Sequence, residues 1–148
     1  MYSLDTKLLV GLSLGSIYLV AFDPYFLLYN TTKGITNQND HLAEQFELML
    51  KDKQGKGQFI TPISHYPLVC SGSSSFCRKC RTILKDFWAS MLNHGVSLYL
   101  GAHWHTYQRI YPYLKNDTFS TQKGDYQSDG GYLVTVVEGV AGNDKDIV

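Results

Sequence analysis

Two histidines in this sequence stand at a spacing that suits metal binding. His103 and His105 lie two residues apart, directly after the apolar run 96–100. In an extended or loop-end backbone, side chains at positions i and i+2 point to the same side, so both imidazoles can face one cavity. A His-x-His pair at a strand end is a common way to present nitrogen ligands to a metal. Taken alone, the pair is equally compatible with two ordinary hydrogen-bonding histidines.

A third histidine strengthens the metal interpretation. His65 follows the β-type run 58–64, and the segment between residues 58 and 100 has the pattern strand, helix, strand. In an open α/β sheet, the carboxyl ends of neighbouring parallel strands meet at one edge, where sites usually form. We therefore predict an α/β fold in which His65, His103 and His105 converge at one edge of the sheet.

The two histidine segments together resemble the last two metal-binding motifs of the calcineurin-like metallophosphoesterases. Residues 102–109 read AHWHTYQR, which is similar to the GHxHxYxR motif of the purple acid phosphatase branch, with alanine in place of the leading glycine. The glycine-rich stretch 139–143 also resembles the end of a late strand in that branch. The resemblance covers most of the chain. It implies part of a β-sandwich flanked by helices, with four layers (α/β/β/α) in the complete domain.

The resemblance also implies a function, the hydrolysis of phosphomonoesters by a binuclear metal centre. Carried over by motif, His65 and His103 would bind one metal ion and His105 the other. Neutral imidazole suits Fe, Zn or Mn, so the residues do not choose among these metals. Tyr107 and Arg109 are candidates for contact with the phosphate-ester substrate.

The sequence departs from the family in ways that matter for this function. The first three family motifs, of the forms DxG, GDxxY and GNH, supply carboxylate and other metal ligands, and none is present. We therefore expect residues 1–148 to be the C-terminal portion of a single catalytic domain, partnered by a missing N-terminal half. The loop 71–75 also lacks the phosphate-binding histidine often found in purple acid phosphatases. Two alternatives stay open: a non-catalytic binding or assembly subunit, and a small glycoprotein with incidental histidines.

The charge composition and the N-terminal apolar run bear on partners and targeting. Thirteen basic and thirteen acidic residues give no net charge, so nothing favours nucleic-acid binding. The apolar run 8–22 resembles a signal peptide, but Asp5 precedes it and no A-x-A cleavage site follows. The run is also too short to span a bilayer comfortably. Gly11 and Gly15 divide it, and we predict two buried strands there.

Three cysteines and two sequons point to an oxidising compartment. Cys70, Cys77 and Cys80 lie close together beside a serine-rich loop, which predicts one local disulfide from Cys70 to either of the other two. The third thiol would be left over, and near a helix start Cys80 could have a lowered pKa. Asn30 and Asn116 lie in N-x-T sequons. We therefore expect a secreted, extracellular, or lysosomal or vacuolar glycoprotein.

Periodicity predicts the other elements. An apolar stripe predicts a helix from residue 39 or 40 to 53, and another stripe predicts a single helix over 77–93. Pro62 favours an edge position or an irregular end for strand 58–64. The further expectations are a polar connection over 25–39, a flexible loop over 71–75, strands over 96–100, 106–113 and 132–138, and surface positions for His41 and His94.

Overall fold

The computed structural model describes residues 9–29, 36–53, 56, 58–71, 74–114, 118–120 and 131–139. Its described strands form one six-stranded sheet in the order β1-β2-β3-β4-β6-β5. The strands are β1 (Leu9–Leu14), β2 (Ile17–Phe22), β3 (Phe59–Ile63), β4 (Leu98–Gly101), β5 (Tyr107–Leu114) and β6 (Tyr132–Glu138). The helices are α1 (Tyr25–Tyr29), α2 (Thr36–Lys53), α3 (Ser75–Ile83) and α4 (Lys85–Asn93).

Strands β2, β3, β4 and β6 run parallel, while β1 and β5 pair antiparallel at the two edges of the sheet. The segment β3-α3-α4-β4 is the strand-helix-strand unit that the sequence predicts, with β3 and β4 as parallel neighbours. Their carboxyl ends therefore lie side by side, and the α/β prediction is confirmed.

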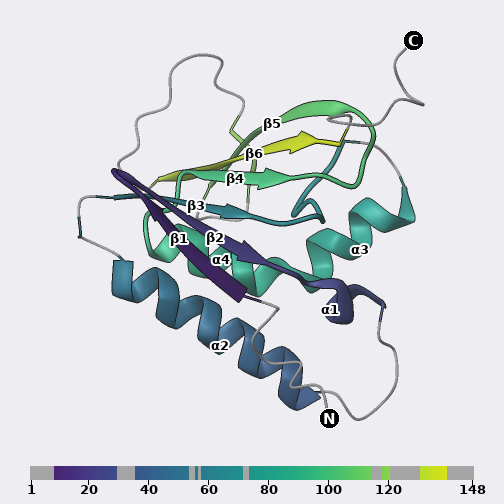
Figure 1. The fold of residues 1–148 in the computed structure, drawn as a ribbon. Coiled ribbons are helices and arrows are strands. Elements are labelled where there is room, and N and C mark those ends of the chain that lie inside the picture. Colours follow the sequence, from purple (N-terminus) through teal and green to yellow (C-terminus); the bar gives the residue numbers. More distant parts are fainter. Residues whose placement is uncertain are drawn as a thin grey trace.

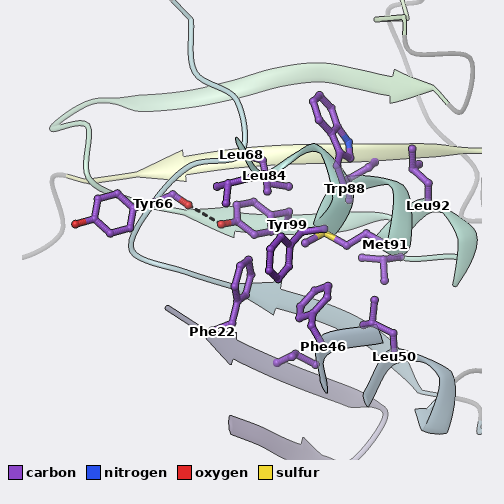
Figure 2. Packing of buried hydrophobic residues seen from close by; sticks show 14 of the residues in the cluster. Phe22, Phe46, Leu50, Tyr66, Leu68, Leu84, Trp88, Met91, Leu92 and Tyr99 are labelled. Atoms are coloured by element: carbon purple, nitrogen blue, oxygen red, sulfur yellow. Dashed lines mark hydrogen bonds between the residues drawn. The ribbon is translucent and has the colours of Figure 1, made fainter. Parts of the chain in front are cut away.

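The helices lie on one side of the sheet (Figure 1). Strand β2 alternates regularly, so that Tyr18, Val20 and Phe22 point into the core while their neighbours point away. Helices α2 and α4 close this core with aromatic and aliphatic side chains (Figure 2). The residues they contribute are Leu42, Phe46, Leu50, Phe87, Trp88, Met91 and Leu92.

The opposite face of the sheet carries large apolar side chains that the described residues leave uncovered. Ile17, Phe59 and Leu100 are 42%, 62% and 37% exposed, respectively. A sheet with helices on one face and an apolar second face is one half of an α/β/β/α arrangement. Within the described ranges, no helix is long and apolar enough to cross a membrane.

The N-terminal strands correct one prediction. Residues 9–22 form an antiparallel hairpin that turns at Gly15, whose φ of 60° suits glycine. Gly11 lies inside β1 and does not interrupt it. Residues 11–14 are exposed because β1 is an edge strand that pairs with β2 alone, so the prediction that both strands are buried was wrong for β1.

Of the two alternatives that Pro62 favoured, the edge position is wrong, because β3 lies between β2 and β4. The Phe59 amide donates to the carbonyl of Ser16, the residue just before β2. The Ser64 amide donates on the other side, to the Leu100 carbonyl of β4. This alternation aims the nitrogen of Pro62 toward β4, where the described pairing begins only at Ile63. A proline is therefore tolerated here without loss of a ladder hydrogen bond.

Four predictions about helices and connections need correction. Residues 75–93 form two helices, α3 and α4, which meet at Leu84. The loop 71–75 is not wholly irregular, because the Ser74 hydroxyl accepts a hydrogen bond from the Cys77 amide and caps α3. The connection after β2 contains α1, whose first amide, from Tyr25, donates to the Asp23 carboxylate. Helix α2 also begins earlier than predicted, at Thr36. Its predicted apolar stripe is confirmed.

A buried hydrogen bond offers a test of this core. The Tyr99 hydroxyl donates to the Tyr66 carbonyl at 2.5 Å, which links β4 to the segment after β3 (Figure 2). Tyr99→Phe leaves that carbonyl without its partner, so we expect a loss of about 1–3 kcal/mol in unfolding free energy. Urea unfolding measures the change. Tyr111→Phe, at a residue that is 52% exposed, is the control, and an equal effect in both variants would contradict the role of this bond.

Candidate metal centre

His65 and His103 meet at the carboxyl ends of β3 and β4. Their ring centroids are 5.2 Å apart, and Nδ1 of His103 lies 3.2 Å from Nε2 of His65. Two imidazole nitrogens bound to one tetrahedral zinc ion are separated by about 3.3 Å. The pair is therefore spaced as two ligands of one metal would be. The same distance allows a direct N–H···N hydrogen bond between the rings.

Backbone contacts fix the two histidine loops against each other. The Ala102 amide donates to the His65 carbonyl at 3.2 Å, one step beyond the Ser64–Leu100 bond that ends the β3–β4 pairing. Gly101 permits this approach, because a Cβ at that position would lie 2.9 Å from the Cα of Pro67. Backbone contacts alone therefore join the two loops.

The loop carrying His103 is tightly folded. The Trp104 amide donates to the Ala102 carbonyl, and the Thr106 amide donates to the Trp104 carbonyl, each closing a three-residue turn. His103 adopts a φ of 70°, which histidine tolerates better than most residues. Such a conformation costs about 1–3 kcal/mol and persists only where the surrounding structure holds it.

Of the two backbone settings that the His-x-His spacing allows, His103 and His105 lie in a loop after the strand end and not in extended backbone. Strand β4 ends at Gly101, so the alternation of side chains along a strand does not apply to residues 103–105. His105 is exposed, and its positive charge contributes to the pKa shift of His103. Among the described residues, no group of three His, Cys, Asp or Glu side chains is arranged to hold a metal ion. The structure therefore brings His65 and His103 together but does not add His105 as a third ligand.

Aromatic rings surround His103. The centroids of Phe76 and Tyr66 lie 4.5 and 5.0 Å from that of His103. Burial, followed by the positive charges of His65 and His105, lowers the pKa of His103. Burial is also the main reason that the pKa of Tyr66 rises to about 12. The site thus presents a neutral imidazole and a protonated phenol at neutral pH.

A disulfide supports the histidine loop from one side. Cys70 is bonded to Cys77, with 5.5 Å between their Cα atoms, which is one of the two pairings that the sequence leaves open. The Trp104 indole nitrogen donates to the Cys70 sulfur at 2.9 Å. Cys80 is free and buried, and burial raises its pKa to about 12. The idea that Cys80 has a lowered pKa was therefore wrong.

The remaining candidate residues from the sequence lie in different parts of the structure. Tyr107 is 63% exposed, and Arg109 lines a cavity beside the disulfide. His94 is not a surface residue, because its side chain is 11% exposed and its Nε2 lies 2.5 Å from a Glu47 carboxylate oxygen. The Asn30 and Asn116 sequons, the side chain of His41, and the stretches 121–130 and 140–148 lie outside the described residues.

The sequence motifs did not single out Tyr66 or Phe76, and they included Gly139 only as part of the glycine-rich stretch 139–143. Tyr66 directly follows His65, so proximity to the motif could have singled it out. Phe76 comes from α3, and nothing in its local sequence points to His103. Gly139 follows β6 and lies against the backbone of Trp104, where a Cβ would overlap the Trp104 carbonyl oxygen. Its glycine is a packing requirement that only the fold makes visible.

Known proteins share this fold. The solved structure of purple acid phosphatase PPD1 from yellow lupin (Lupinus luteus) matches with a TM-score of 0.63 over 89% of this chain and 23% of that one, at 20% identity. The fold is purple acid phosphatase-like. An acid phosphatase of Aspergillus ficuum is 31% identical over an alignment of 122 residues, and the match covers 74% of this chain and 19% of the relative. The predicted resemblance is therefore confirmed, and this purple acid phosphatase-like chain spans a minor part of both proteins' length.

A further solved structure matches at lower similarity. GAP50, described as the anchor in the inner membrane complex of Plasmodium, gives a TM-score of 0.51 at 13% identity, over 85% of this chain and 44% of that chain. No family model matches the sequence.

The contact at Gly139 predicts a specific perturbation of the histidine site in this purple acid phosphatase-like fold. Gly139→Ala should push the Trp104 carbonyl away and cost about 1–3 kcal/mol of stability, as overpacking does. Trp104 fluorescence and the imidazole proton signals of His103 should shift with it. Ala89→Ser, which adds one atom to an exposed position on α4, is the control. Unchanged signals in Gly139→Ala would contradict the packing described here.

The free cysteine predicts a chemical result. Cys80 is buried with a pKa of about 12, so the folded protein should resist iodoacetamide at pH 8. In denaturant, one thiol should react, and two more only after reduction of the Cys70–Cys77 bond. Mass spectrometry of the alkylated peptides checks both steps. Rapid labelling of Cys80 in the folded state would contradict its burial.

Proposed function

We propose that the protein carrying this chain is a metal-dependent phosphatase that hydrolyses phosphomonoesters, with residues 1–148 as the C-terminal portion of its catalytic domain. The observation that carries the proposal is the His65–His103 pair, 3.2 Å apart at the ends of two adjacent parallel strands. Similarity to an acid phosphatase in sequence and to a purple acid phosphatase in fold supports it.

The donor set of the chain fits one half of such a centre. His65 Nε2 and His103 Nδ1 would hold one metal ion, and His105 would bind a second. These nitrogens suit Fe, Zn or Mn. When bound, such ions lower the pKa of water and stabilise negative charge on phosphate oxygens. The described residues bring no carboxylate into this group, so the remaining ligands must come from elsewhere in the protein.

The residues around the pair keep it ready to bind. The lowered pKa leaves His103 neutral at neutral pH, so its ring nitrogen has a lone pair for a cation. Phe76 and Tyr66 pack near its ring and limit both its rotation and the access of water. The Ala102–His65 hydrogen bond holds the two loops at one separation. The chain thus positions nitrogen ligands before any metal arrives.

The proposed setting is an oxidising compartment, whether extracellular, lysosomal or vacuolar. The Cys70–Cys77 disulfide supports this, because such bonds persist outside the reducing cytosol. Glycosylation at Asn30 and Asn116 would fit the same compartment.

Replacement of the histidines tests the proposal in the protein at its natural full length. His65→Ala and His103→Ala should each lower p-nitrophenyl phosphate hydrolysis and metal content about 10- to 100-fold or more, because each variant loses a metal ligand. The control is His94→Gln, which removes an imidazole held by Glu47 at the end of α4. That variant should keep both activity and metal.

Two results would overturn this function. Full hydrolysis by the His103→Ala protein would exclude His103 as a ligand. A folded wild-type protein that binds no Fe, Zn or Mn and hydrolyses no phosphomonoester would instead favour the non-catalytic binding subunit. Circular dichroism of each variant separates loss of the site from loss of the fold.

A further inference from the structure

Every arginine of the sequence lines one cavity. Arg78 and Arg81 come from α3, where a spacing of three residues places them on one helix face, and Arg109 comes from β5. The cavity has a volume of about 560 Å³. Its described lining is Val69, Cys70, Ser71, Cys77, Arg78, Arg81, Arg109, Ile110, Tyr111 and Phe119.

The charge in this cavity is not balanced by its walls. Within the described ranges, no Asp or Glu lines it and none of the three arginines takes part in an ion pair. Arg81 lies over the Phe119 ring, with its guanidinium carbon 5.3 Å from the ring centroid. Lys53 and Lys56, by contrast, both contact Asp52. The described walls of the arginine cavity therefore carry positive charge with no carboxylate paired to it.

The cavity is also held in shape by its own bonds. The Cys70–Cys77 disulfide ties the segment around Val69 to α3, which carries two of the arginines. Gln108, next to Arg109, accepts a hydrogen bond from the Ser71 amide and so fastens β5 to the same segment. Helix α3 and strand β5 are thus anchored to one short loop, and the three arginines line one cavity from these two anchored elements.

We propose that this arginine cavity binds an organic phosphate, a small molecule that carries a phosphate group on an apolar or aromatic body. Guanidinium groups bind phosphate oxygens through paired, charge-assisted hydrogen bonds. The apolar walls, Val69, Ile110 and Phe119, would receive the body of the ligand. A pocket that is mostly apolar with a few converging charged groups matches this class of ligand and discriminates against bare inorganic anions.

The arginine cavity is distinct from the histidine pair. No histidine lines it, and neither does Trp104, which contacts Cys70 from within the histidine loop. Cys70 belongs to the wall of the cavity, so the disulfide forms the boundary between the two places. Binding in the cavity needs no metal and no hydrolysis.

Calorimetric titration with phenylphosphonate tests the inference, because its carbon–phosphorus bond resists phosphatases. The natural full-length protein is titrated with EDTA present, so that no metal contributes. We expect phenylphosphonate to bind more tightly than inorganic phosphate, and phenol to bind negligibly. Arg78→Gln, Arg81→Gln and Arg109→Gln should each weaken phenylphosphonate binding about 5- to 20-fold through loss of a charge-assisted contact.

Matched variants separate the effect of the planar guanidinium group from the effect of positive charge alone. Lys85→Gln removes an exposed cation from α4 that does not line the cavity, and it should leave the affinity unchanged. Arg109→Lys keeps the charge but not the planar fork, and it should still weaken binding several-fold. His103→Asn should bind as the wild type does. Equal affinity in all the arginine variants, or binding of phenol as tight as that of phenylphosphonate, would overturn the inference, whatever the protein hydrolyses.

Discussion

The pairing of β3 with β4 at their carboxyl ends is the constraint on which the rest of this structure depends. Only a short stretch of the two strands is in register, from Ile63 opposite Leu100 to the Ala102–His65 hydrogen bond. That stretch sets the separation of the two loops, and the loops carry His65 and His103. Because the bonds are between backbone atoms, they hold the imidazoles close without any metal. The short pairing also explains how β3 accommodates a proline inside the sheet.

Close packing then decides what the loop after β4 can be. Gly101 and Gly139 each lie where a Cβ would meet backbone atoms, those of Pro67 and Trp104 respectively. With no side chain in the way, the loop folds back on itself and places His103 at a positive φ. The conformational cost falls on one residue, while many contacts share the task of holding it. This is how a site can keep a strained residue in a stable fold.

The disulfide gives the molecule a shared structural element. The Cys70 sulfur accepts a hydrogen bond from the Trp104 indole of the histidine loop, and both cysteines of the disulfide line the arginine cavity. A short covalent loop of this kind limits the motion of the residues on both sides of it, so the histidine loop and the arginine cavity are supported by one rigid segment. The burial of Cys80 next to it keeps the spare thiol protonated, because burial raises its pKa to about 12. Disulfide exchange within the cluster is thereby suppressed.

The sequence by itself determined the local pattern: the strand-helix-strand unit over 58–100, the stripe of α2, the strand 132–138, and histidines just beyond two strand ends. These follow from periodicity and turn chemistry, which act over a few residues. Tertiary structure decided the rest. It selected Cys77 as the partner of Cys70, placed His94 against Glu47, set Pro62 in an interior strand, and brought His65 and His103 within contact of each other. It also gathered Arg78, Arg81 and Arg109 around one cavity. Each of these outcomes depends on which distant segment becomes a neighbour, and that choice is made by packing across the sheet, not by the spacing of residues along the chain.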